Sequence, residues 1–327
     1  MNATGLIIGK FMPPHRGHVH LVDAARARVG HATIVVCSRD CEPIPGALRV
    51  QWMRELFPDC AVLHLHEDLP QEPGESPGFW ELWTAALRRL VPAGPDVVFT
   101  SEPYGDELAR RLGARHVCVD PARATVPASG TAIRSDPLAR WEDLPVPVRP
   151  YFLKRVVVTG AESTGKTTLA RRLAEHFGTA WVPEHARGML DALGRFVRES
   201  DFPDIAAGQI ASENSLARSA DRLLFCDTDL NATVIYATHF FGRVPAWIAD
   251  SSRSRRYDLF LLCDVDLPWV PDPQRDQPHR REFFHNWFRA RLEEQGRPWA
   301  LVSGTGEERF ACALRALTAS SLRSSTA

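Results

Sequence analysis

Short apolar runs alternate with amphipathic segments along the whole chain of 327 residues. The apolar runs cover residues 6–8, 33–37, 97–100, 156–159, 223–226 and 259–263. Helical periodicity follows two of them, at residues 19–28 and 168–177, and an alternating pattern around His64 and His66 indicates a further strand. Because strands that alternate with helices form parallel sheets, the pattern predicts an α/β fold with two parallel sheets.

A proline-rich stretch at residues 144–150 divides the chain into halves that are each long enough for a core of their own. Three prolines fall within six residues there, and proline both lacks an amide proton and disfavours helix in the residue before it. We therefore expect an extended connection, with one domain at residues 1–148 and a second at residues 149–327.

The charge balance limits the classes of partner. The 39 basic and 40 acidic side chains nearly cancel, so we expect neither nucleic acid nor an anionic membrane surface as a partner. No segment has the composition of a secretion signal or of a membrane span, and the seven cysteines are scattered without a C-x-x-C pair. The sequence predicts a cytoplasmic protein with reduced cysteines.

The first strand leads into a histidine pair at the start of a predicted helix. His15 and His18 lie three residues apart, on one face of the first turn, with Gly17 between them. Helix starts bind phosphate through free amide groups, and imidazoles there can donate hydrogen bonds to phosphate oxygens. We expect Gly17 to let phosphates approach the backbone, at a site that positions ATP for attack by a substrate phosphate.

A second motif of the form S-x-T-x-x-R occupies residues 129–134. Ser129, Thr131 and Arg134 would contact the β- and γ-phosphates of ATP. The histidine pair and this motif resemble the two signatures of the nucleotidyltransferase superfamily, which implies a Rossmann-like domain that transfers an adenylyl group.

Four residues between these motifs are candidates for substrate binding. Arg49 and Arg54 could bind a mononucleotide phosphate, although arginines on a helix are often solvated. Trp80 or Trp83 could stack on a nicotinamide ring, but tryptophans at helical spacing are often core residues. Both pairs of alternatives stay open.

A complete P-loop follows the strand at residues 156–159. Its sequence, G-x-x-x-x-G-K-T, runs from Gly160 to Thr167. Loop amides would surround the phosphates of a second ATP, Lys166 would neutralise the β- and γ-phosphates, and Thr167 would be a ligand of Mg²⁺. The second domain is therefore expected to be a P-loop kinase.

A carboxylate at the end of a neighbouring strand should complete the magnesium site. Asp227 is the first choice and Asp229 the second. Asp264 and Asp266 follow another apolar run in the same way, and we expect them to be loop residues beyond a further strand.

Two further groups could act on the second substrate. Glu184 could orient or deprotonate a substrate hydroxyl, or it could pair with Arg187. The stretch at residues 268–281 is rich in proline and arginine, and is typical of a lid that closes Arg275 over the phosphates; a basic surface loop would have the same composition.

Together these segments resemble the NadR family. The similarity rests on residues 9–18, 99–105, 129–131, 149–155, 162–166 and 268–270, and extends over nearly the whole chain. It implies nicotinamide mononucleotide (NMN) adenylyltransferase activity in the first domain and ribosylnicotinamide kinase activity in the second. Both would use ATP and Mg²⁺, so the implied ligands are nicotinamide riboside, NMN, ATP and NAD.

The resemblance also implies roles for individual residues. The implied catalytic residues are His15, His18, Lys166 and Asp227, with Thr167 and Asp227 as metal ligands. The first ATP would contact Gly9, Lys10, Phe11, His15, His18, Ser129, Thr131 and Arg134. The second ATP would contact Gly160, Glu162, Ser163, Thr164, Gly165, Lys166, Thr167, Thr168 and Arg275, and Trp269 would lie near the substrate.

The chain departs from the family pattern in two places. Some members carry an N-terminal helix-turn-helix and repress genes, whereas here the first strand begins within five residues of Met1, so we expect no DNA-reading module. In the lid, Pro273 stands where the family pattern Asp-Gly-x-Arg has glycine, and proline lacks glycine's backbone freedom. A nucleotide-sensing regulator without turnover, other nucleotide acceptors and a homo-oligomer remain open.

Overall fold

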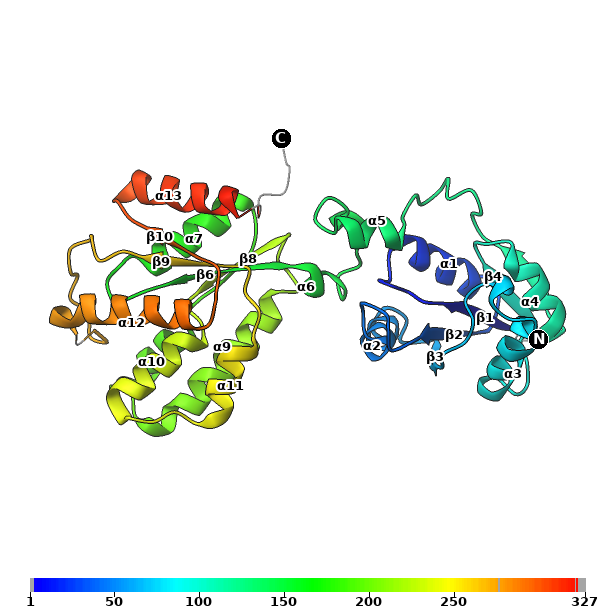
Figure 1. Ribbon diagram of the computed structural model, residues 1–327, viewed down its shortest axis with the longest axis horizontal. Coiled ribbons are helices and arrows are strands. Elements are labelled where there is room, and N and C mark those ends of the chain that lie inside the picture. The colour runs from blue at the N-terminus through cyan, green and yellow to red at the C-terminus, as the bar shows by residue number, and fades with distance from the viewer. Residues whose placement is uncertain (1–2, 276, 321, 323–327) are drawn as a thin grey trace. The chain divides into compact units, whose positions relative to one another are not determined.

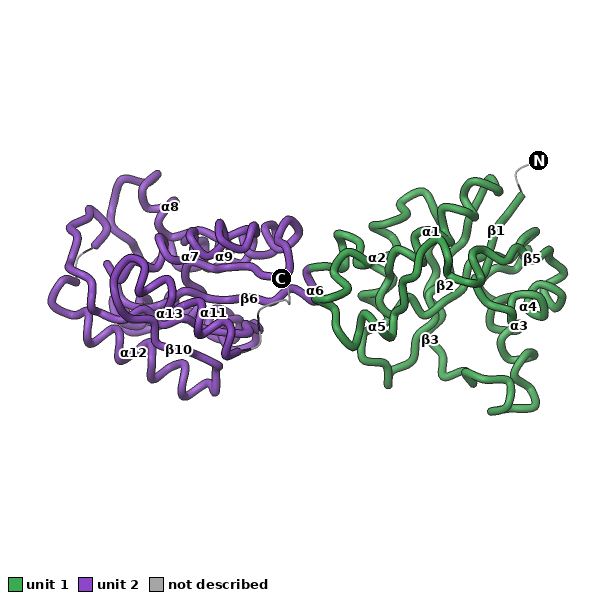
Figure 2. Tube along the Cα trace, turned by 90° about the horizontal axis from the view of Figure 1, so that it is seen from above, with its two compact units in different colours: residues 1–149 green, residues 150–327 purple. Residues whose placement is uncertain are grey.

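A computed structural model describes residues 3–275, 277–320 and 322. The chain forms two compact units, residues 1–149 and 150–327 (Figure 2). In the described part of the chain each unit contains one five-stranded parallel sheet, which confirms the predicted α/β class. None of the described helices combines the length and the apolar composition that a membrane-spanning segment requires.

The first unit has a sheet with strand order β3-β2-β1-β4-β5. Its main elements are β1 (Thr4–Gly9), α1 (Arg16–Arg26), β2 (His31–Ser38), α2 (Gly46–Leu56), β3 (Ala61–His66), α3 (Phe79–Leu90), β4 (Val97–Thr100), α4 (Tyr104–Leu112), β5 (Arg115–Cys118) and α5 (Gly130–Ser135). Short 3₁₀ turns lie at Pro73–Glu75 and Trp141–Asp143. The strand order reverses beside β1, and in such sheets ligands bind at the carboxyl ends of the strands at this point.

Side chains alternate between the two faces of this sheet. Ile7 and Ile34 pack in one core cluster with residues of α1 and α2. Leu6 and Val35 pack in a second cluster with residues of α3 and α4. This period of two explains why continuous apolar runs mark the central strands: both faces are covered by helices.

The second unit has strand order β10-β9-β6-β8-β7. Its elements are α6 (Arg149–Phe152), β6 (Lys154–Thr159), α7 (Lys166–Phe177), β7 (Trp181–Val182), α8 (His185–Leu193), α9 (Phe202–Leu216), β8 (Leu223–Asp227), α10 (Leu230–Phe241), α11 (Ala246–Ser254), β9 (Leu259–Cys263), α12 (Arg281–Glu294), β10 (Trp299–Val302) and α13 (Gly306–Ala319), with 3₁₀ turns at Glu199–Asp201 and Pro278–Arg280. Helices α7 and α13 cover one face of the sheet, and α9 to α12 lie on the other (Figure 1).

The connection at residues 144–150 is not extended, and that prediction is wrong. The backbone N–H of Val148 donates to the carbonyl oxygen of Pro145 at 2.9 Å, and Pro150 lies in the short helix α6. Proline tolerates the first turn of a helix because the amide it lacks would have no helical partner there. Burial of Leu144 and Val148 adds to the preference for a compact turn.

The edge strands β5 and β10 do not coincide with any apolar run of the sequence analysis. Strands β5 and β10 are four residues long and form one edge of their respective sheets. Their side chains are partly exposed, so neither strand has the continuous apolar run that marks a central strand.

The packing of α3 predicts unequal effects for two leucines on the same helix. Leu87 is buried, whereas Leu82 is 45% exposed. Leu87→Ala should lower the free energy of unfolding of the first unit by about 3 kcal/mol, because it leaves a cavity in the core, whereas Leu82→Ala should change it by less than about 0.5 kcal/mol. Urea unfolding followed by tryptophan fluorescence measures both, and equal effects would contradict the assigned packing.

Candidate active sites

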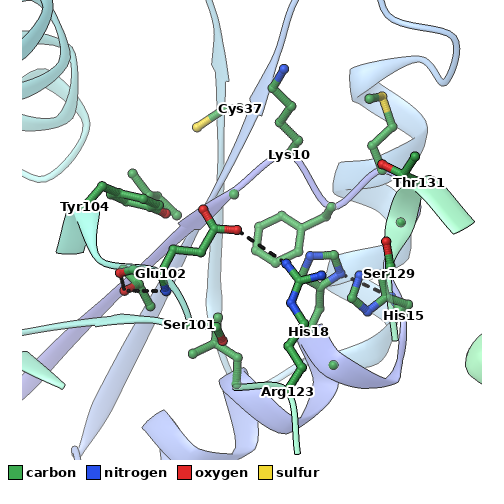
Figure 3. Close-up of a pocket in the computed structure, with 18 of the residues that line it drawn as sticks. Lys10, His15, His18, Cys37, Ser101, Glu102, Tyr104, Arg123, Ser129 and Thr131 are labelled. Atoms are coloured by element: carbon green, nitrogen blue, oxygen red, sulfur yellow. Dashed lines mark hydrogen bonds and ion pairs between the residues drawn. The ribbon is translucent and has the colours of Figure 1, made fainter. Parts of the chain in front are cut away.

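The first unit contains a cavity of about 620 Å³ at the carboxyl ends of β1 and β4 (Figure 3). Its walls come from the β1–α1 loop, α1, the β4–α4 loop and the segment that leads into α5. All eight residues expected to bind the first ATP line it: Gly9, Lys10, Phe11, His15, His18, Ser129, Thr131 and Arg134. The fold thus brings both predicted motifs to one cavity.

The two histidines form a stacked pair at the start of α1. Their ring centroids lie 3.7 Å apart, and the backbone N–H of His15, the N-cap residue, donates to Nδ1 of His18 at 3.3 Å. Since Nδ1 of His18 accepts this hydrogen bond, a neutral ring carries its proton on Nε2. A Cβ atom at Gly17 would lie 3.1 Å from the His15 ring, so glycine here leaves room for the imidazole.

Burial keeps both imidazoles neutral. It lowers the pKa of His15 to about 4, with the charge of Arg123 acting in the same direction. Burial also lowers the pKa of His18 well below its usual value, assisted by His15 and Arg123. Near pH 7 the pair can therefore donate hydrogen bonds to a phosphate but supplies no positive charge.

The second motif is bonded directly to the first. Ser129 caps α5 by accepting a hydrogen bond from the backbone N–H of Ala132 at 3.5 Å. Arg134 donates to the carbonyl oxygen of Met12, in the β1–α1 loop, and to the Thr131 hydroxyl at 3.2 Å. A Cβ atom at Gly130 would lie 2.9 Å from the Met12 oxygen, so this close approach requires glycine.

Of the four candidate substrate residues of this unit, two line the cavity and two do not. Trp80 and Trp83 line the cavity and also pack against the core, and Nε1 of Trp83 donates to the carbonyl oxygen of Pro70 at 2.8 Å. Arg49 and Arg54 do not line it.

Arg49 is fully buried, so its interpretation as a solvated helix residue is wrong. It pairs with Glu42 and donates to the carbonyl oxygens of Lys10 and Cys37. Arg54 donates to the carbonyl oxygen of Val62 at 3.3 Å. Arg49 therefore supports the loop that carries Lys10.

The P-loop of the second unit joins β6 to α7. Gly160 has φ 134°, and a Cβ atom there would lie 2.9 Å from the carbonyl oxygen of Cys263; Gly165 has φ 78°. Side chains of other types rarely adopt such backbone angles. Within the loop, the Thr164 hydroxyl and the Lys166 ammonium both donate to the carbonyl oxygen of Ala161, at 2.7 and 2.9 Å.

Two arginines that the sequence analysis missed support this loop. Arg281 donates to the carbonyl oxygens of Ser163 and Leu267, at 3.0 and 2.8 Å. Arg309 donates to the carbonyl oxygen of Thr164 at 3.0 Å. No local motif marks them, because their partners in the P-loop, Ser163 and Thr164, are more than a hundred residues away in the chain.

Asp227 ends β8 beside the P-loop strand, in register with Val158 of β6. Burial raises its pKa, while the Lys166 charge and the Thr167 hydroxyl act in the opposite direction. Among the described residues neither of its buried carboxylate oxygens accepts a hydrogen bond of ordinary geometry. A buried carboxylate with free oxygens beside the Thr167 hydroxyl fits a Mg²⁺ ion.

The three other candidate acids that follow β8 and β9 have internal partners. Asp229 precedes α10 and accepts a hydrogen bond from the Asn231 amide at 3.0 Å, and burial raises its pKa to about 7. Asp264 accepts from the backbone N–H of Val265 at 2.8 Å, and Asp266 pairs with Arg309. The last two lie beyond β9, as predicted for loop acids.

Glu184 lies immediately before α8 and close enough to the P-loop to sense its charges. Burial and Asp227 raise its pKa, whereas Lys166, Arg187 and Arg275 lower it, and the net shift is upward. The alternative, a pair between Glu184 and Arg187, is not formed: within the described chain Arg187 pairs with Asp191 and Asp272 instead.

The arginine-rich segment at residues 268–281 contacts the P-loop through Val270, near the start of the segment. The backbone N–H of Val270 donates to Oγ of Ser163 at 2.9 Å. Arg275 donates to the carbonyl oxygen of Val270 at 2.8 Å, and its own N–H donates to Asp272, closing a turn that contains Pro273. Proline favours the second position of such a turn, so it is compatible with this backbone. Trp269 is half-buried in the same segment.

Comparison with known proteins places this geometry in context. A family model described as "AAA domain" matches residues 155–309. The "Trifunctional NAD biosynthesis/regulator protein NadR" of Escherichia coli (strain K12) is 28% identical over 314 residues, covering 89% of this chain and 76% of that protein. The protein of the same name from Salmonella typhimurium is 28% identical over 292 residues, covering 83% and 71%.

The structure also superposes on solved structures of NadR proteins. A NadR protein in complex with NR superposes with a TM-score of 0.81 at 25% identity, covering 97% of this chain and 95% of that one. The chain is NadR-like. A second NadR protein, in complex with NAD and AMP-PNP, gives a TM-score of 0.83 at 23% identity over 100% and 98% of the two chains, and so shares the fold of the NadR-like chain. The resemblance seen in the sequence motifs is confirmed.

The buried histidine pair predicts that the NadR-like chain loses stability in acid. The pKa of His15 is about 4 in the fold against about 6.5 when exposed, so between these pH values the unfolded chain binds more protons. The contribution of His15, about 3 kcal/mol, is complete above pH 6.5 and is lost as the pH falls toward 4. Urea unfolding at several pH values gives the free energy of unfolding as a function of pH. Between pH 4 and 6.5 this free energy should change less steeply with pH for His15→Asn than for the wild type. An unchanged pH dependence would contradict the lowered pKa of His15.

Proposed function

We propose that the first unit transfers the adenylyl group of ATP to NMN and so makes NAD. A phosphate oxygen of NMN attacks the α-phosphorus of ATP and forms a new P–O bond. The bond between the α-phosphorus and the oxygen that bridges it to the β-phosphorus breaks, and pyrophosphate leaves with the electron pair of that bond. The observation that carries the proposal is the cavity in which the stacked His15 and His18 face Ser129 and Thr131.

The residues of this cavity would act by positioning rather than by covalent chemistry. The Nε2–H of His18 would donate to a phosphate oxygen, and Ser129 and Thr131 would bind the departing phosphates. Trp80 and Trp83, which line the same cavity, are candidates for stacking on the nicotinamide ring.

The second unit is proposed to phosphorylate nicotinamide riboside. Its P-loop would bind ATP, and Lys166 would neutralise the β- and γ-phosphates. Thr167 and Thr168 are exposed at the start of α7, where they could contact the same phosphates. Thr167 and Asp227 would hold Mg²⁺, which would balance phosphate charge. The NR complex of a similar NadR protein and the words "NAD biosynthesis" in the names of the two relatives support these substrates.

The geometry favours different roles for two acids. Asp227 is enclosed beside Lys166 and Thr167, which suits a metal ligand. Glu184 is less enclosed and has no ion pair with Arg187, so its carboxylate could accept the proton of the substrate hydroxyl. Asp229 is a weaker candidate for either role because it already binds Asn231.

Incubation of the protein with nicotinamide riboside, ATP and Mg²⁺, with products separated by chromatography, tests the pair of reactions. NMN that appears first and is followed by NAD would support both activities. The name of the relatives includes "regulator", and a chain that binds these ligands without turnover would favour that alternative.

Two substitutions should separate the reactions. His18→Ala should lower the rate of NAD formation from NMN and ATP by at least about 10²-fold and leave phosphorylation of nicotinamide riboside unchanged. Lys166→Ala should have the reverse effect. Each variant is the control for the other, and a folded variant that loses both activities would refute the assignment of one reaction to each unit.

The two acids should respond differently to magnesium and to pH. Asp227→Asn should raise the Mg²⁺ concentration needed for half-maximal kinase rate, whereas Glu184→Gln should leave it unchanged and lower kcat about 10²-fold. Because the pKa of Glu184 is raised above 4.5 and a base acts deprotonated, the wild-type rate should fall as the pH drops through that raised value. Glu175→Gln, at an exposed position of α7, is the matched control. Equal magnesium dependence in both acid variants would contradict the division of roles.

A further inference from the structure

Three lysine and arginine side chains line the cavity of the first unit in the described part of the chain: Lys10, Arg123 and Arg134. The ammonium of Lys10 pairs with Glu42 at 3.2 Å, and the side chain of Glu42 is only 6% exposed. Arg134 is engaged in joining the two motifs through the carbonyl oxygen of Met12. To bind a phosphate, Lys10 and Arg134 would therefore have to release these structural partners.

A triphosphate in this cavity needs more positive charge than the histidines supply. His15 and His18 are neutral near pH 7, since burial lowers the pKa of both rings. Charge that develops on a phosphate during transfer is best stabilised by a cation that is already in place. The remaining cation is Arg123, whose charge already acts on both rings.

Arg123 lies on a loop whose backbone is fixed. The Asp120 carboxylate accepts hydrogen bonds from the backbone N–H groups of Ala124, Thr125 and Val126, at 2.8 to 3.1 Å. The N–H of Arg123 donates to the carbonyl oxygen of Asp120 at 2.9 Å, and its φ is 51°. This loop directs the guanidinium into the cavity beside the two histidines (Figure 3).

The partner of Arg123 is weakly bound. Its guanidinium lies 3.5 Å from the Glu102 carboxylate, and the two side chains are 51% and 56% exposed. Exposed pairs at this distance contribute little, so separating them costs little. The Thr100 hydroxyl donates to the carbonyl oxygen of Glu102 at 2.7 Å, so the backbone of Glu102 stays fixed while its carboxylate is free to turn away.

We propose that Arg123 is a phosphate-binding residue that exchanges the Glu102 carboxylate for the phosphates of a nucleoside triphosphate beside His15 and His18. The proposal rests on the adenylyl transfer proposed for this unit. Glu102 then competes with the nucleotide for the guanidinium, and its removal should help binding rather than weaken it.

This competition makes opposite predictions for the two partners. In NAD formation from NMN and ATP, Arg123→Ala should lower kcat/KM for ATP about 10²-fold, with little change in KM for NMN. Glu102→Gln should lower KM for ATP about threefold, because the arginine is released. Arg123→Lys, which keeps the charge without the planar fork, should recover part of the loss.

The outcomes separate the proposal from its alternatives. If the pair only fastened two loops, Arg123→Ala and Glu102→Gln would change kcat/KM in the same direction, and the proposal would be overturned. A loss confined to KM for NMN would overturn it as well. Arg115→Ala, at an exposed position at the start of β5, is the matched control and should act like the wild type, with folding checked by thermal melting. A wild-type chain that makes no NAD would instead overturn adenylyl transfer itself, and the role of Arg123 with it.

Discussion

Parallel strands all end at the same edge of their sheet, and both candidate sites depend on this constraint. In the first unit the ends of β1 and β4 bring the histidine loop beside the β4–α4 loop. In the second, the register of Val158 with Asp227 places an acid next to the P-loop. Buried central strands leave little freedom to shift this register, since a slip of one residue would exchange the two covered faces.

The two candidate sites offer different groups to a bound phosphate. The second has Lys166 and Thr167 beside a buried acid, Asp227, whose oxygens accept no hydrogen bond of ordinary geometry from the described residues, an arrangement suited to a divalent ion. In the first, the central imidazoles are neutral and the flanking cations have partners. Neutral donors can select a phosphate by geometry at no cost in buried charge, whereas stabilisation of developing charge has to come from the rim of the cavity.

The sequence predicted the parts of the fold and of the sites that depend on local pattern. The central strands and the P-loop are examples, because apolar runs and glycine spacing are visible without tertiary contacts. The arginines show where this ends. Arg49 is buried against Glu42, Arg309 supports the P-loop, and Arg123 faces the histidine pair, yet nothing in their immediate neighbours distinguishes them from solvated arginines. Their environments are set by residues distant in the chain.

The environments of one glycine and one proline likewise depend on the folded structure. Gly17 is expected from sequence to admit phosphate; it lines the cavity, and its contact with the His15 ring gives a second reason for glycine that the sequence alone did not reveal. Pro273 differs from the family's glycine, yet it lies in a turn that proline favours, closed by the hydrogen bond from Arg275 to Asp272. A rigid residue in that turn reduces the conformations open to the segment without ligand, so less entropy would be lost in the lid closure that the sequence pattern predicts. The substitution is therefore compatible with an ordered Arg275, and it exchanges flexibility for preorganisation.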